Sequence, residues 1–157
     1  MKIREYRIEP AEEKDWQPAM ELAYKTFLQY EAKEYGENGT RKFAEFVSDE
    51  RLKNFFLAGE YKLFVARKEG EVVGMISLRS GNHISLLFVD TEYHRCGIGR
   101  HLVTYLQEYM LKNTIYSKVT VHAAPYAVPF YHTLGFRDTG TVTRQDDIIF
   151  TPMEFYL

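Results

Sequence analysis

Two glycines, Gly97 and Gly99, stand where a predicted strand gives way to a predicted helix, and they could bind an anion there. The apolar run 84–89 suits a strand that is covered on both faces. Beyond the glycines, apolar residues recur every four positions and so share one face of a helix: Ile98, Leu102, Leu106 and Met110. Glycine leaves the backbone bare for a ligand, while free N–H groups and the helix dipole attract negative charge. The stretch therefore predicts a phosphate site.

Two familiar phosphate-binding motifs do not fit this stretch. The loop of nucleoside triphosphatases requires Lys-Ser or Lys-Thr after its last glycine, whereas Arg100 and His101 follow here. A dinucleotide fingerprint requires a third glycine at G-x-G-x-x-G spacing, and Leu102 occupies that position. A small Rossmann-like nucleotide binder is therefore the less favoured alternative.

The spacing resembles the pyrophosphate loop of the GNAT superfamily of N-acetyltransferases, which reads Q/R-x-x-G-x-G/A after a strand. This chain carries the loop from His94 to Gly99, with His94 where the family prefers Gln or Arg. Backbone N–H groups do most of the phosphate binding in such a loop, so the departure leaves the resemblance in place.

A second stretch, residues 124–136, resembles the other GNAT signature, A-x-x-F-Y-x-x-x-G-F. Here Phe130 and Tyr131 are followed by Gly135 and Phe136. Taken locally, the stretch is a short amphipathic helix that ends at Gly135 and places Phe130 and Phe136 in the core. The two motifs occur in the family's order, and the resemblance covers most of the chain from Tyr61 onward.

The resemblance implies a cofactor site for acetyl-CoA, used as a co-substrate, and no metal. Its pyrophosphate would lie on the loop residues Arg95, Cys96, Gly97, Ile98, Gly99 and Arg100. Either arginine could add a charge-assisted contact or simply be exposed near a helix start. Free backbone groups of Phe88 and Val89 would pair with the pantetheine arm, and a backbone N–H would polarise the thioester carbonyl. Cys96 lies in the loop rather than beside the thioester, so we interpret it as structural or incidental.

The resemblance also implies two catalytic residues. Tyr131 occupies the position of the family's general acid, and a phenol with a pKa of ~10 stays protonated at neutral pH. The alternative is a buried tyrosine with a hydrogen-bonded hydroxyl. In several family members the general base is a glutamate fourteen residues before the first loop glycine, and this chain has His83 at that position. An imidazole can accept a proton near neutral pH, although His83 could equally be packed or solvated. His122 and His132 are weaker candidates.

The order of predicted elements indicates an α/β (α+β) fold with a mixed, mostly antiparallel central sheet and helices on both faces. Strands are predicted at 62–66, 72–78, 84–89, 117–122, 141–143 and 148–155. Gly74 inside a strand predicts a bulge or a close backbone approach. This order matches the GNAT acyl-CoA N-acyltransferase fold, whose fourth and fifth strands splay apart at the cofactor site.

The N-terminal part is predicted to hold a strand at 3–8, closed by Pro10, and a helix whose first turn contains the acids Glu12, Glu13 and Asp15. A bend at 35–39 precedes helical stretches at 40–47 and 51–57. By resemblance, this part forms one wall of the acceptor cleft. The wall would offer Tyr30, Glu31, Glu34, Tyr35 and Glu37. Such carboxylates could hold a cationic amine, but acids on an exposed helix are usually just solvated.

Composition indicates a single domain, residues 1–157, without nucleic-acid or membrane partners. The net charge is −2 and the pI is near 6.2, which does not suggest a nucleic-acid surface. No apolar run approaches the ~20 residues of a membrane span, and the start of the chain lacks a signal-peptide core. Cys96 is the one cysteine, which fits a reducing, cytoplasmic compartment.

The sequence thus predicts an N-acetyltransferase that moves the acetyl group of acetyl-CoA to a primary amine. An alternative from another class is an acyl-CoA-binding module that kept the fold and lost catalysis. The acceptor, a small molecule or a peptide, is not identified by the sequence. The apolar tail 150–157 suggests a homodimer unless it docks within its own domain.

Overall fold

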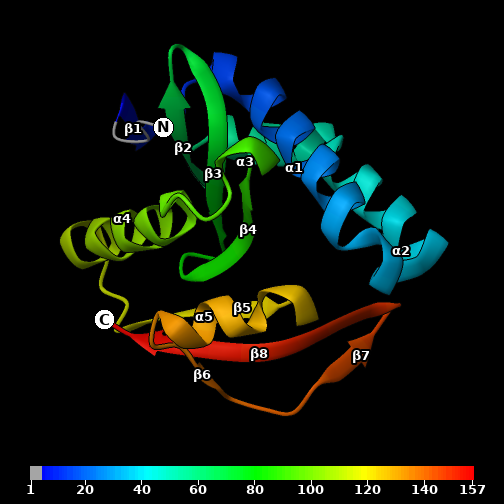
Figure 1. Cartoon of the computed structure of the whole chain (residues 1–157). Coiled ribbons are helices and arrows are strands. Elements are labelled where there is room, and N and C mark those ends of the chain that lie inside the picture. The colour runs from blue at the N-terminus through cyan, green and yellow to red at the C-terminus, as the bar shows by residue number, and fades with distance from the viewer. Residues whose placement is uncertain (1–4) are drawn as a thin grey trace.

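The computed structural model describes residues 5–157, and its eight strands form a sheet in the order β1-β2-β3-β4-β5-β8-β6, with β7 paired to β8 (Figure 1). The strands are β1 (Tyr6–Pro10), β2 (Lys62–Lys68), β3 (Glu71–Arg79), β4 (His83–Val89), β5 (Lys118–Ala123), β6 (Arg137–Asp138), β7 (Thr143–Gln145) and β8 (Ile148–Tyr156). Each neighbouring pair is antiparallel except β4 and β5. The predicted mixed, mostly antiparallel sheet is confirmed.

Helices cover both faces of this sheet, as predicted. The α-helices are α1 (Trp16–Tyr30), α2 (Ala32–Val47), α3 (Glu50–Leu57), α4 (Ile98–Asn113) and α5 (Val128–Thr133). The short 3-10 helices are η2 (Glu13–Asp15), η3 (Thr91–Tyr93) and η4 (Pro125–Ala127). One core cluster joins α1 to α3 with the sheet, and a second joins α4 and α5 with the sheet. These two cores fix the helices that carry the candidate site.

The packing of α4 explains the glycine within β3. A Cβ atom at Gly74 would lie 3.2 Å from both Ile98 Cγ2 and Leu102 Cδ1. The predicted close approach is therefore confirmed, because a side chain here would crowd the two α4 side chains that pack on this glycine. A bulge also lies next to this glycine, because Ala66 pairs with Gly74 whereas Arg67 pairs with Val72, which leaves Val73 as the extra residue of β3. A second register shift, between β3 and β4, lies between Ser77 and Leu78.

The helical wall differs from the predicted boundaries. The bend is confirmed at Gly36, whose φ of 71° and ψ of −176° interrupt α2. Residues 37–39 are nevertheless helical, so α2 begins at Ala32 rather than at Thr40. A positive φ is accessible to glycine without strain, so one residue was enough to turn the chain. Phe43 and Phe46 are partly rather than fully buried.

The two ends of the chain also differ from the predictions. Part of the expected strand 3–8 lies outside the described residues, and β1 runs on to Pro10. At the other end, β6 was not predicted, and β7 begins at Thr143 rather than at Thr141. Two exposed residues, Arg137 and Asp138, are too short a run for an alternating pattern to identify.

The apolar tail is docked within this chain. In β8, residues 151–156 pair with β5, and Phe150 and Met153 are buried. The fold therefore accounts for the observation on which the dimer prediction rested, and the dimer stays a prediction. Within residues 5–157, no helix is long and apolar enough to cross a membrane.

Candidate active site

The predicted phosphate loop joins β4 to α4. Gly97 is the N-cap of α4 and has a φ of 85°, which glycine adopts without strain. Helical hydrogen bonding begins where the N–H of His101 donates to the Gly97 carbonyl at 3.0 Å. The N–H groups of Ile98, Gly99 and Arg100 precede it in the first turn. A Cβ atom on Gly97 would meet nothing within 4 Å, so open space borders the loop, as a phosphate requires.

A cavity of about 620 Å³ lies against this loop. Nearly all the residues predicted to bind the cofactor line it: Phe88, Val89, Arg95, Gly97, Ile98, Gly99 and Arg100. Cys96 does not line it, and its thiol lies 3.4 Å from the carbonyl oxygen of His94. The structure thus brings the loop and the end of β4 together around one space but leaves the Cys96 side chain outside it.

The cavity occupies the place where β4 and β5 separate. These strands pair only at His83 with Thr120 and at Ile84 with Val121. Figure 1 shows the sheet opening below β4, with α5 near the gap. The remaining backbone groups of β4 on this side are therefore left without a strand partner from β5.

The alternation of the strand decides which of those groups face the gap. The N–H of Asp90 donates to Val73 in β3 at 2.8 Å, so the N–H and C=O of Val89 point to the opposite side. By the same alternation Leu87 faces the gap, whereas the backbone of Phe88 faces β3. Phe88 thus differs from the expectation, because it offers the cavity its side chain rather than backbone groups.

One backbone acceptor at the gap already has a partner. The Nε2 atom of His94 lies 2.7 Å from the Val89 carbonyl oxygen, so Nε2 carries the proton and donates it. The His94 ring also lies 5.0 Å from the ring of Tyr30, whose other neighbour is Tyr126 at 5.1 Å. The residue that departs from the family motif therefore connects the loop to the end of α1.

Sequence reasoning missed several residues of this cavity. They come from α1, the β4–α4 connection, η4 and α5: Thr26, Tyr93, Tyr126 and Phe130, with Leu87 from β4. Tyr126 and Phe130 lie inside the second signature, which was a usable signal. Thr26 and Tyr93 have no local pattern that would mark them.

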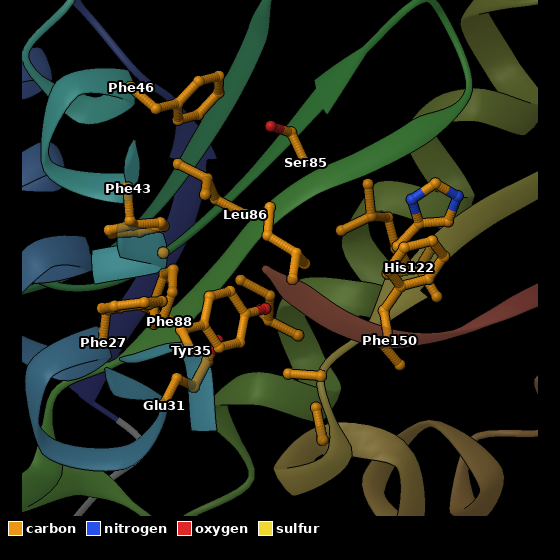
Figure 2. Close-up of a pocket in the computed structure, with 18 of the residues that line it drawn as sticks. Phe27, Glu31, Tyr35, Phe43, Phe46, Ser85, Leu86, Phe88, His122 and Phe150 are labelled. Carbon is orange, nitrogen blue, oxygen red and sulfur yellow. The ribbon is translucent and has the colours of Figure 1, made fainter. Parts of the chain in front are cut away.

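A second cavity, of about 500 Å³, lies between the helical wall and the C-terminal strands. Figure 2 shows Phe27, Phe43 and Phe88 on one side, with His122 and Phe150 opposite. The hairpin of β7 and β8 reaches α2, where Asn38 Nδ2 donates to Asp147 Oδ2 at 2.9 Å. This cavity matches the predicted acceptor cleft in place, with the helical wall on one side.

His83, the predicted base, lines this second cavity but not the first. Its Nδ1 atom lies 2.7 Å from the Thr120 hydroxyl, and its ring lies 4.6 Å from that of His122. Burial first, then the charges of Arg79 and His122, lower the pKa of His83 to about 4. His83 is therefore neutral at pH 7. His132 lies apart, paired with Asp138 at 2.7 Å.

The two cavities share Glu31, Leu87, Phe88, Ala127 and Tyr131. Tyr131 is 3 % exposed, and burial, followed by the charge of Glu31, raises its pKa above the usual value of a phenol. No hydrogen bond among residues 5–157 engages its hydroxyl, yet no fully buried side-chain oxygen there lacks a partner. The hydroxyl must therefore border the cavities, as a proton donor to a bound ligand requires.

The described residues contain no group of three or more His, Cys, Asp or Glu side chains placed to hold a metal ion. The site thus consists of a phosphate loop, a split in the sheet and two cavities that meet at a tyrosine.

Fold and site together define an acyl-CoA-binding protein of the N-acetyltransferase type. A family described as "Acetyltransferase (GNAT) domain" matches residues 31–157. The chain belongs to the GNAT acetyltransferase family, and the predicted fold is confirmed.

Solved structures and a curated relative agree with that assignment. A GCN5-related N-acetyltransferase from Rhodopseudomonas palustris is 22 % identical with a TM-score of 0.84, covering 100 % of this chain and 99 % of its own. The PaiA N-acetyltransferase of Thermoplasma acidophilum, solved with coenzyme A, is 21 % identical with a TM-score of 0.78, covering 97 % and 99 %. Spermidine N-acetyltransferase from Vibrio cholerae, solved with CoA and spermine, is 17 % identical with a TM-score of 0.72, covering 98 % and 96 %.

The curated relative is a glucosamine 6-phosphate N-acetyltransferase from Trypanosoma brucei brucei, 33 % identical over 95 residues. The match covers 54 % of this chain, and the chain spans 64 % of the length of that relative.

Proposed function

We propose that this protein transfers the acetyl group of acetyl-CoA to a primary amine. The observation that carries the proposal is the junction at Tyr131, where a cavity behind a phosphate loop meets a second cavity. An acyl donor in the first cavity and an amine in the second would meet there, so the amine could attack the thioester directly, without a covalent acyl-enzyme intermediate. We also propose that residues 1–157 form a single domain, since one sheet runs from β1 through β8.

The first cavity suits acetyl-CoA in shape and chemistry. The first-turn N–H groups of α4 would hold the pyrophosphate, while Arg95 and Arg100 line the same space and add positive charge. The pantetheine arm would lie along β4 as an added strand. Within that strand, the N–H of Val89 faces the gap and would polarise the thioester carbonyl.

Tyr131 would complete the reaction as general acid. The amine nitrogen forms a bond to the thioester carbon, and the carbon–sulfur bond breaks with its electron pair on sulfur. The Tyr131 hydroxyl then gives its proton to that sulfur, while the nitrogen loses a proton to solvent as the amide forms, and a proton from solvent restores the Tyr131 hydroxyl. Because burial and the charge of Glu31 raise its pKa, Tyr131 is protonated when the thiolate forms.

The lining of the second cavity favours an acceptor whose amine is attached to an apolar or aromatic body. Seven phenylalanine and tyrosine side chains line it: Phe27, Tyr35, Phe43, Phe46, Phe88, Tyr131 and Phe150. The carboxylates in the described lining are Glu31 and Asp146, while Lys42 and Arg79 are cationic. A polyamine, the ligand of the Vibrio relative, would meet as many fixed cations as anions here. A sugar phosphate, as in the trypanosomal relative, would leave hydroxyl groups against aromatic walls.

Thiol release from acetyl-CoA, measured against a panel of amines, tests this proposal. The panel holds phenylethylamine, an amino acid, glucosamine 6-phosphate and spermidine, with calorimetry of CoA binding alongside. We expect turnover above background hydrolysis, highest with the arylalkylamine. Tight CoA binding without turnover by any amine would instead identify an acyl-CoA-binding module.

A further inference from the structure

One carboxyl group, that of Glu31, lies at the junction of the two cavities. We infer that Glu31 is the general base that takes a proton of the acceptor's ammonium group before its nitrogen attacks the thioester. This inference rests on the proposed function and adds a catalytic residue to it. Among the residues that the structure describes, Glu31 is the one carboxylate that lines both cavities.

The backbone holds Glu31 at the join of two helices. Glu31 is both the C-cap of α1 and the N-cap of α2. Its N–H donates to the Phe27 carbonyl at 2.8 Å, and its own carbonyl accepts from Glu34 and Tyr35 at 3.1 and 3.3 Å. Figure 2 shows the Glu31 side chain beside the Tyr35 ring at the edge of the acceptor cavity. The carboxyl is thus placed by two helices rather than by a free loop.

The groups around Glu31 suit a base that works near neutral pH. Burial first, then the negative charge of Glu34, raises the pKa of Glu31 to about 7. Other titratable groups near it are the phenols of Tyr35 in α2, Tyr126 in η4 and Tyr131 in α5, whose pKa values are raised first by burial and further by the charge of Glu31. These phenols are neutral at pH 7 and compete for no proton. Cationic side chains line the same cavities, Arg95 and Arg100 the first and Lys42 and Arg79 the second. A base is most effective when its pKa lies near the operating pH.

Glu31 and Tyr131 together would close the proton balance of a turnover. The ammonium nitrogen loses two protons on its way to the amide. The first passes to the Glu31 carboxylate before the attack, and the second passes to water once the nitrogen is bonded to the carbonyl carbon. Tyr131 gives a proton to the departing sulfur. Each turnover then leaves a protonated Glu31 beside a tyrosinate. Because the carboxyl is the stronger acid, its proton returns to Tyr131, directly or through water, and both residues are reset.

His83 is less suited to the same role. It lines the acceptor cavity but not the cofactor cavity, so it lies away from the junction. Its pKa of about 4 makes it a weak base toward an ammonium group. The two candidates therefore differ in the pH at which activity appears: near 7 for Glu31 and near 4 for His83.

The test is the pH profile of kcat/KM for the wild-type protein and the Glu31→Gln variant, with Glu45→Gln as a matched control. Glu45 is an exposed acid on α2 that lines neither cavity. We expect an ascending limb with an apparent pKa near 7 in the wild type and in Glu45→Gln. Glu31→Gln should lose that limb and about 10²–10⁴-fold of its rate at pH 7, with CoA affinity by calorimetry unchanged.

Two further experiments distinguish a general base from a residue with a purely structural role. Fluorine substitution can lower the pKa of an acceptor amine below the assay pH, so that the amine binds in its neutral form. Such an amine needs no base, so Glu31→Gln should hardly lower the rate of its acetylation. Glu34→Gln removes a negative charge that raises the pKa of Glu31, so it should move the ascending limb to lower pH.

The possible failures are distinct. If Glu31→Gln keeps the wild-type rate and limb, or slows ordinary and fluorinated amines equally, Glu31 is not the base, although the proposed function stands. A limb near pH 4 that is lost in His83→Gln assigns the role to His83. If the wild-type protein turns over no amine of the panel, the proposed function falls, and the inference falls with it.

Discussion

Removing only the hydroxyl of Tyr131 separates proton donation from packing. In Tyr131→Phe the ring keeps its contacts with Phe130 and Phe136, whose ring centroids lie 5.3 and 5.1 Å away. The hydroxyl engages no hydrogen bond within residues 5–157, so its loss leaves no buried group unsatisfied. The folding free energy should therefore change by less than ~0.5 kcal/mol, while catalysis loses its acid.

The expected loss follows from the usual worth of general acid catalysis, ~10²–10⁴ in kcat, or about 2.7–5.5 kcal/mol in activation free energy. Single-turnover formation of the acetylated amine measures it, because this assay excludes product release. CoA affinity should barely change, since the donated proton matters most in the transition state. A single-turnover rate within twofold of the wild type would refute the reasoning and leave protonation of the thiolate to water.

Three other predictions test the loop, the core and the assembly. Gly97→Val should weaken CoA binding by at least tenfold in calorimetry, more than Gly97→Ala, because both lose the favourable positive φ but only valine adds bulk beside the phosphate. Equal affinity in all three proteins would contradict this. Gly74→Ala forces a Cβ to 3.2 Å from Ile98 and Leu102, which should cost ~1–3 kcal/mol and lower Tm by about 2–12 °C; an unchanged Tm would show that α4 adapts freely. The sequence-based expectation of a dimer is checked by light scattering, where a mass near 18.5 kDa across micromolar concentrations contradicts it.

Local sequence patterns were enough to predict most of the fold and the cofactor loop. The spacing of Ile98, Leu102, Leu106 and Met110 predicted α4, and the structure buries all of these side chains. Gly97 lies where its positive φ is needed, because both the turn and the helix cap depend on residues adjacent in sequence. Such features are readable since their physical causes lie within one or two turns of chain.

The candidate site was less readable where it depends on distant segments. Glu31, Glu34 and Glu37 look alike as acids in a helical wall, yet only Glu31 lies in the cavities while the other two are exposed. Glu31 differs because it stands at the join of α1 and α2 and borders the space that Tyr131 of α5 also lines, an arrangement that no local pattern contains. The orientation of Phe88 depends likewise on its register with β3, and a shift of one residue exchanges the groups that face the gap.

The brief pairing of β4 with β5 also links the occupancy of the site to the stability of the whole fold. Two residue pairs join the strands, helped by the N–H of Thr120, which donates to the Asn82 carbonyl at 2.9 Å. A pantetheine arm in the gap would form hydrogen bonds with main-chain groups that have no strand partner there, and so would bridge the N-terminal and C-terminal strands. A ligand that binds only the folded chain stabilises it by about 2.7 kcal/mol at a hundredfold excess over Kd. The stability of the folded chain would therefore depend on the concentration of CoA in the cell, because bound CoA would help to hold the two parts of the sheet together.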